Sequence, residues 1–202
     1  MTKQKQPPMT ETRELLTTDP LEIREEDDGK RTLSGYAVKW EMKSQPMGWF
    51  RRFKEQFKRG AFADSLTKDD QRYLWSHDIS KVLGRTKNGT LRLYEDNIGL
   101  RFELDLPNTT LGNDTYESIK RGDVDGVSFG FRMKKEEWDE SDPDNVLRTI
   151  SQADLFEISA VAFPAYPDSE VQARSESDPY QQYKQEQEQR SKRKKLLLQT
   201  YL

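Results

Sequence analysis

Ser128 is the residue whose surroundings first suggest chemistry. It stands in the stretch Gly126-Val127-Ser128-Phe129-Gly130, which has the composition of a strand. Side chains alternate across a strand, so Val127 and Phe129 are predicted on the core face and Ser128 on the opposite face. The two glycines leave open space around its hydroxyl and permit another backbone or a ligand to approach. Ser128 is therefore either a nucleophile or an ordinary solvent-facing strand serine beside a bulge.

Two further residues could serve such a nucleophile. Glu157 lies in the middle of an apolar run at 154–163, where an ionised carboxylate is costly unless a cation or several donors meet it. His77 ends Tyr73-Leu74-Trp75-Ser76-His77, and a period of two places it on one face with Tyr73 and Trp75. Taken singly, Glu157 fits an ordinary ion pair and His77 fits a structural or exposed histidine.

Together the three residues have the composition of a catalytic triad. A serine hydroxyl is a weak nucleophile that needs a base, and the base needs a third group to fix its tautomer. Triads are recognised by geometry rather than by chain order, so the order His77, Ser128, Glu157 is allowed. Ser159 is a rival nucleophile because it shares the predicted face of Glu157, but it lacks the glycine clearance of Ser128.

Composition excludes several other chemistries. The chain of 202 residues has no Cys and a single His, which excludes thiolate nucleophiles, thiolate zinc sites, disulfides and any multi-histidine metal site within one chain. The formal net charge of −3 gives no global field for nucleic acid. No apolar run approaches the length of a membrane span, so we expect a soluble chain compatible with a reducing cytoplasm.

The elements that must position these residues are short strands with few helices. The pattern predicts a β-hairpin over 21–40, short helices at 60–66 and 111–121, and Gly122 as the cap that ends the second helix. Further strands are predicted at 73–77, 82–86, 91–95, 98–106, 124–138, 146–153 and 155–163. The expected fold class is mainly β with helices (α+β), an antiparallel β-barrel, closed or partly closed, surrounded by short helices.

Polar ends flank this predicted core. Hydrophobic residues make up 33% and charged residues 34% of the chain, and the apolar ones are sparse at both ends. We expect a disordered segment at 1–20, a domain at 21–174, and a charged, Gln-rich tail at 175–202 that is helical or disordered. The tail is either a solvated helix or a basic peptide that binds a partner or polyanion. The basic aromatic stretch 49–59 is predicted to be a loop whose role is open.

An ordered set of motifs resembles the prohead (capsid maturation) proteases of tailed bacteriophages. The resemblance runs from about Leu21 to Arg174 and rests on these motifs: Gly60-Ala61-Phe62, His77 with Val82-Leu83-Gly84 behind it, Gly122, Val127-Ser128-Phe129-Gly130-Phe131, and Leu155-Phe156-Glu157-Ile158-Ser159 followed by Pro164-Ala165. Each motif is weak alone, and their order and spacing carry the specificity.

The resemblance implies a fold and a set of roles. The family is similar in fold to herpesvirus assemblins, which are serine peptidases built on a β-barrel with surrounding helices. Ser128 would be the nucleophile, His77 the general base and then acid, and Glu157 the third member, where the herpesvirus relatives use a second histidine. Neither a cofactor nor a metal is implied. Backbone N–H groups near Ser128 or within 148–160, or the side chains of Arg132 or Arg148, are candidate oxyanion donors.

The resemblance also implies a substrate and a setting. Such proteases act inside the procapsid in the host cytoplasm, cut the scaffold or the scaffolding segment of the major capsid protein, and commonly cut themselves. A homo-oligomer is possible, while no membrane or specific nucleic-acid partner is expected. An extended substrate could add as a strand beside 125–133, where Gly126 and Gly130 would let it approach.

Two readings compete with a protease. The first is a non-catalytic scaffold or capsid-assembly protein that keeps the barrel and binds coat protein through its charged tail. The presence of Ser128, His77 and Glu157 at all three matching positions favours the enzyme. The second is a nucleic-acid-binding barrel that would use 51–59 and 192–195, and the overall acidity of the chain counts against it.

Overall fold

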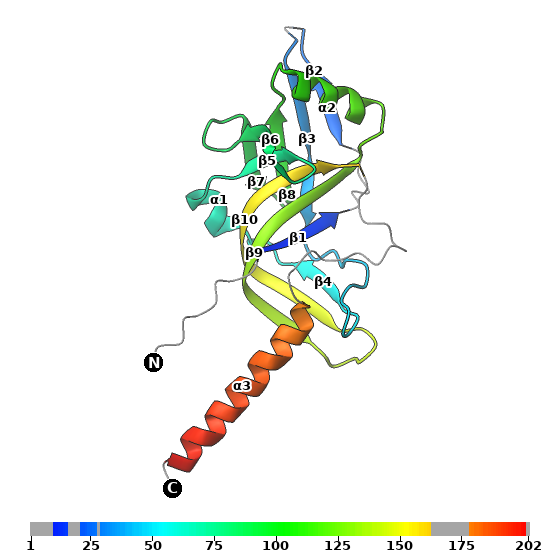
Figure 1. The fold of residues 1–202 in the computed structure, drawn as a ribbon. Coiled ribbons are helices and arrows are strands. Elements are labelled where there is room, and N and C mark those ends of the chain that lie inside the picture. The colour runs from blue at the N-terminus through cyan, green and yellow to red at the C-terminus, as the bar shows by residue number, and fades with distance from the viewer. Residues whose placement is uncertain (1–9, 16–20, 28, 163–177, 201–202) are drawn as a thin grey trace.

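A computed structural model describes residues 10–15, 21–27, 29–162 and 178–200, which form two β-sheets and three helices (Figure 1). Its strands are β1 (Thr10–Leu15), β2 (Glu22–Glu25), β3 (Arg31–Lys39), β4 (Lys54–Phe57), β5 (Arg72–Trp75), β6 (Asp78–Arg85), β7 (Leu91–Glu95), β8 (Gly99–Asp105), β9 (Gly126–Asp139) and β10 (Leu147–Val161). Its helices are α1 (Ala63–Lys68), α2 (Thr110–Lys120) and α3 (Pro179–Thr200).

The sheets are open, and the predicted closed or partly closed antiparallel barrel is wrong. One sheet has the order β1-β9-β10-β5-β6, with β4 also paired to β10, and the other has the order β2-β3-β8-β7. Strands β4 and β5 run parallel to β10, far from it in sequence. Alternation shows which face of a strand is buried, but it carries no signal for parallel pairing or for whether edge strands meet.

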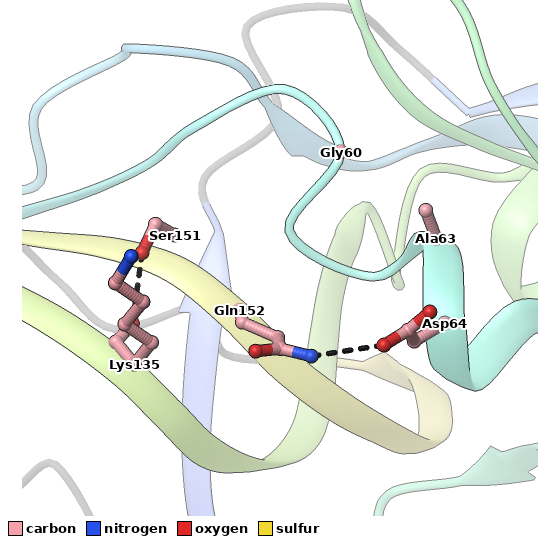
Figure 2. Close-up of a pocket in the computed structure, with 6 residues that line it drawn as sticks. All are labelled: Gly60, Ala63, Asp64, Lys135, Ser151 and Gln152. Carbon is pink, nitrogen blue, oxygen red and sulfur yellow. Dashed lines mark hydrogen bonds between the residues drawn. The ribbon is translucent and has the colours of Figure 1, made fainter.

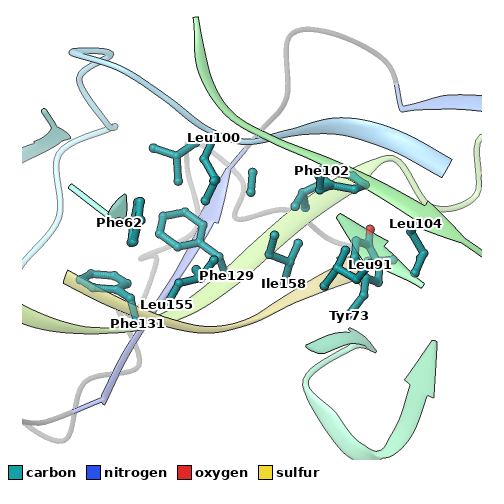
Figure 3. Close-up of a cluster of buried hydrophobic side chains, with 14 of the residues drawn as sticks. Phe62, Tyr73, Leu91, Leu100, Phe102, Leu104, Phe129, Phe131, Leu155 and Ile158 are labelled. Carbon is teal, nitrogen blue, oxygen red and sulfur yellow. The ribbon is translucent and has the colours of Figure 1, made fainter. Parts of the chain in front are cut away.

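The core lies between the two sheets (Figure 3). Phe129 and Phe131 of β9 and Ile158 of β10 pack there with Leu100 and Phe102 of β8. The alternation within 126–131 is therefore confirmed, since Val127, Phe129 and Phe131 all belong to this cluster. A sheet packed in this way holds the opposite face of β9 in a fixed position, which is where Ser128 was expected.

Most predicted elements are present. The hairpin over 21–40 is confirmed as β2 and β3, and the two predicted helices are confirmed as α1 and α2. Gly122 follows α2 with φ +77°, the left-handed conformation that ends helices. The strands predicted at 146–153 and 155–163 are one strand, β10. Strand β4 lies within the stretch 49–59 that was predicted to be a loop, and the sequence pattern missed it because four residues are too few to show a period.

Both polar ends contribute structure. Thr10–Leu15 form β1, although disorder was predicted for 1–20; the remainder of that segment lies outside the described residues. In the tail, α3 extends away from the sheets (Figure 1). Its first turn is anchored by Tyr180, which packs with Phe53 and Trp138 in a second apolar cluster. Within the described residues, no helix combines the length and apolarity needed to cross a bilayer.

Candidate active site

Pairing of β9 with β10 brings Ser128 and Glu157 to one sheet face. Ser128 lies opposite Ser159 and Gly130 lies opposite Glu157. Directly opposed residues of an antiparallel pair present their side chains on the same face. The four positions therefore form a compact patch on the face away from the core.

A β-bulge at Phe156 is what places Glu157 in this patch. Phe131 pairs with Leu155 and the adjacent Gly130 pairs with Glu157, so β10 carries one extra residue. Without it, strict alternation would place Glu157 on the same face as Leu155, which is buried in the core. Bulges commonly re-aim a side chain beside an active site.

His77 reaches the patch from a turn and not from a strand. Strand β5 ends at Trp75, and Ser76 and His77 form a turn with φ values of 51° and 61°. The predicted shared face with Tyr73 and Trp75 is therefore wrong. The turn contains no Gly or Asn that would have indicated it. Left-handed conformations are costly for such residues, and two bonds to β10 hold this pair: Ser76 N–H to Ala160 O at 3.0 Å and His77 N–H to Ser159 Oγ at 3.1 Å.

The imidazole and the carboxylate are directly bonded. His77 Nδ1 lies 2.8 Å from Glu157 Oε1, and Ser159 Oγ donates to Glu157 Oε2 at 2.6 Å. A carboxylate at Nδ1 accepts a hydrogen bond from the Nδ1–H group, which keeps the proton on Nδ1 and leaves Nε2 as the basic nitrogen. Nε2 is buried and has no hydrogen-bond partner among the described residues. The arrangement thus presents a base with a fixed tautomer and an unused acceptor.

Ser128 is buried rather than solvent-facing. Its side chain is 0% exposed, and its hydroxyl donates to the Arg13 carbonyl oxygen of β1 at 3.0 Å. The hydroxyl is therefore engaged with β1, so it is not donated to Nε2 of His77. Hydrogen bonds between nucleophile and base are often absent or loose until substrate is bound.

Ser159 shares the face of Glu157, as predicted, and its hydroxyl is engaged there. Its hydroxyl donates to Glu157 and accepts from the His77 main chain, which ties the base and the carboxylate to the same strand. Because these two bonds engage the hydroxyl, Ser159 is a weaker candidate nucleophile than its place on this face alone would suggest. Its spacing of two residues from Glu157 indicated the shared face, but the contact with His77 depends on a turn that the sequence did not reveal.

Gly130 makes room for the carboxylate. A Cβ atom at Gly130 would lie 2.8 Å from Glu157 Oε1, the oxygen bonded to His77. Gly126, the other predicted substrate-binding glycine, pairs with Val161 at the start of β9 and precedes the residues that β1 contacts. The absence of a side chain at Gly130 is therefore explained by the space that the Glu157 carboxylate needs. The substrate-binding role of both glycines stays a prediction.

Replacing Gly130 by alanine tests this packing. If Glu157 is the third member of the predicted triad, we expect Gly130→Ala to lower kcat by about 100-fold, because the methyl group displaces Glu157 and misplacement of a catalytic group by about 1 Å costs that much. Gly89→Ala is the control, since an added Cβ there meets nothing within 4 Å. Unchanged kcat in Gly130→Ala, measured beside Gly89→Ala, would show that the carboxylate tolerates displacement.

The two arginines considered as oxyanion donors differ in their surroundings. Arg148 is 1% exposed, and its guanidinium donates to Glu11, Glu55 and Glu136. Because these carboxylates occupy it, we no longer expect Arg148 to serve an oxyanion. Arg132 lies on β9 beyond Gly130, with its guanidinium carbon 4.8 Å from the centre of the Phe156 ring. The oxyanion donors stay a prediction.

A pocket of about 330 Å³ lies elsewhere on the same strands (Figure 2). Its lining consists of Gly60, Ala63, Asp64, Lys135, Ser151 and Gln152. Gln152 Nε2 donates to Asp64 Oδ2 across it at 2.9 Å. The lining includes none of the three predicted catalytic residues, so this pocket is separate from the site described above.

A buried serine, an imidazole and a carboxylate bonded to that imidazole, gathered on one face of a β-sheet, are the components of a serine hydrolase site. The chain belongs to the caudovirus prohead serine protease family, whose family model matches residues 19–185. No curated protein and no solved structure matches the chain. The family resemblance inferred from the sequence is confirmed, and the matched span contains β2 to β10 but not β1.

Proposed function

We propose that this chain is the serine endopeptidase of phage capsid maturation, that it cleaves the scaffold or the scaffolding segment of the major capsid protein inside the procapsid, in the host cytoplasm, and that it also cleaves itself. Membership in the prohead protease family supports the reaction class. The observation that carries the assignment of residues is the 2.8 Å contact of His77 Nδ1 with Glu157, on the sheet face that holds Ser128.

The proposed reaction is acyl transfer through a covalent intermediate. Ser128 Oγ attacks the scissile carbonyl carbon while His77 Nε2 takes its proton, and the same nitrogen then protonates the departing amine. Water attacks the acyl ester by the reverse sequence and regenerates Ser128. Glu157 stabilises the imidazolium formed in each half-reaction, and Ser159 holds Glu157 in place.

The likeness to herpesvirus assemblins divides into two parts. An acidic third member in place of their second histidine agrees with the single histidine of this chain and with the Glu157 contact. Their barrel is not found in the described part of this chain, whose sheets are open, and the oligomeric state of this chain is left open. The proposal depends on neither, because all three residues of the proposed triad come from one chain.

Co-expression with the coat protein tests the proposal. We expect the wild-type chain to trim the coat protein, and Ser128→Ala and His77→Ala to leave it intact, because each variant removes a reacting group. Ser151→Ala is the control, since Ser151 is a β10 serine outside the site. Equal trimming in all four would overturn the assignment, and no trimming in any would favour a non-catalytic assembly protein.

A further inference from the structure

Strand β1 occupies the position where an extended substrate would bind. It pairs antiparallel with β9 from Thr10 opposite Arg132 to Leu15 opposite Val127. It forms the edge of its sheet, beyond the strand that carries Ser128. The addition of an extended segment to a sheet edge through main-chain hydrogen bonds is a common mode of peptide recognition. Within β1, the Arg13 carbonyl is the one that meets the Ser128 hydroxyl.

Two side chains of β1, Glu11 and Arg13, bind to a buried site of charged residues. Arg13 donates from Nε to Glu55 Oε1 at 2.6 Å and from Nη2 to Glu55 Oε2 at 3.0 Å, a two-pronged contact with a residue of β4. Two residues earlier, Glu11 accepts from Arg148 of β10 at 2.6 and 2.9 Å. All four side chains are buried. Glu55 and Arg148 together form the charged clamp.

The electrostatics of the clamp favour a specific pair of charges. Burial alone would raise the pKa of Glu11, yet attraction to Arg13 and hydrogen bonding to Arg148 outweigh it and lower that pKa to about 2. Without β1, Arg148 would keep Glu55 and Glu136 as partners, and the three would sum to one negative charge. This net negative charge favours a basic side chain at Glu55. The acidic position two residues before it rests on the bonds that Glu11 accepts from Arg148.

Three features indicate that β1 is an occupant of this sheet rather than part of its foundation. It makes its sheet pairing with β9 alone. It lies outside the residues matched by the family model, which begin at 19. It also engages the serine that the proposed reaction requires to be free, since the Ser128 hydroxyl donates to the Arg13 carbonyl oxygen at 3.0 Å. A strand with these properties must leave, or be cut, before another substrate can bind.

We infer that the charged clamp is the specificity site of this protease and that β1 occupies it as a built-in first substrate. The clamp selects extended segments in which an acidic residue is followed by any residue and then by a basic residue. This inference rests on the proposed function. The bond at risk is the Arg13–Glu14 peptide bond: Ser128 Oγ bonds to the Arg13 carbonyl carbon and its proton passes through His77 to the Glu14 nitrogen, which leaves as an amine. Water then releases the Arg13 carboxylate.

Binding tests the clamp without requiring catalysis. The host is the full chain carrying Ser128→Ala and Arg13→Gln, so that nothing is cleaved and β1 competes less. The probe is a fluorescent peptide with the sequence of residues 9–17, compared by anisotropy with the same peptide carrying Arg13→Gln. We expect the arginine peptide to bind at least tenfold more tightly. Adding Glu55→Gln to the host should reduce that ratio below threefold, and Glu55→Asp, which keeps the charge, should restore part of it.

Glu137→Gln is the matched control, because Glu137 is a strand glutamate in an exposed ion pair with Lys58. It should leave the tenfold preference intact. Equal binding of both peptides to the host that keeps Glu55, or binding of neither peptide to it, overturns the clamp as the specificity site. An unchanged ratio in a folded Glu55→Gln host overturns the part assigned to Glu55.

A cleavage assay separates failure of this inference from failure of the proposed function. With Ser128 present, mass spectrometry of the peptide should show a new amino terminus at the residue equivalent to Glu14, and the Arg13→Gln peptide should be cut at least tenfold more slowly. Coat protein cut in a Ser128-dependent way without this preference would reject the clamp and keep the protease. Selective binding with neither substrate cut would reject the protease and keep the clamp as a peptide-binding site.

Discussion

Glu157→Gln is expected to lower kcat by about 10⁴-fold, the size of the effect known for the equivalent change in a serine protease triad. The amide that replaces the carboxylate has one oxygen and no charge. If that oxygen faces His77 Nδ1, the imidazolium formed during attack loses its counter-charge. If the NH2 group faces Nδ1, the proton is forced onto Nε2 and the base is in the wrong tautomer. Both orientations disable the site.

The measurements must separate this effect from damage to the fold. We expect KM to change by less than about threefold and the melting temperature by only a few degrees, because Glu157 contacts His77 and Ser159 rather than the apolar core. Glu157→Asp should recover part of the rate, since it restores the charge, and Glu137→Gln should behave as wild type. A kcat for Glu157→Gln within tenfold of wild type would remove Glu157 from the triad.

Arg148→Met is expected to destabilise the fold by about 3–5 kcal/mol, the cost of removing one partner from a buried ionic cluster. Burial alone would lower the pKa of Arg148, but attraction to the surrounding carboxylates raises it well above the usual value, so it is charged throughout the accessible pH range. Its removal leaves Arg13 to face Glu11 and Glu55 and leaves Glu136 without its buried cation.

Urea denaturation measures this loss as a lower midpoint at constant slope. Lys58→Met is the control, because its ion pair with Glu137 is about half exposed and should be worth less than about 1 kcal/mol. Combining Arg148→Met with Glu136→Gln and Glu11→Gln should recover a large part of the stability, since the buried charges then balance. Full stability of Arg148→Met alone would show that the carboxylates do not need this cation.

The two β9 features predicted from sequence depended on local information. Alternation placed Phe129 and Phe131 in the core and Ser128 on the other face, because the period of a strand needs only neighbouring residues. Assembly of the candidate site on that face depends on features that neighbouring residues do not determine. These are a bulge at Phe156, a left-handed turn at Ser76 and His77, and strand pairs separated by about 80 residues. Nothing in the local composition encodes those.

The role of β1 could not be predicted for a similar reason. Thr10 to Leu15 lacks the apolar alternation that marks a half-buried strand, and its stabilisation comes from charges. Glu11 and Arg13 look like solvated residues until their partners on β4 and β10 are known. Those partners lie 42 and 137 residues away, so only the folded chain brings them together.

The central place of β10 has a consequence for the order of synthesis. This strand pairs with β4, β5 and β9, supplies Glu157 and Ser159, and is the last strand in the part of the chain that the structure describes. Long-range pairings form only after the chain between them exists. During translation, the serine and the histidine are therefore made well before anything can hold them together. For the proposed function, a nascent chain therefore lacks an assembled triad until residue 161 is free, and β1 must still leave Ser128 before another protein can be cut.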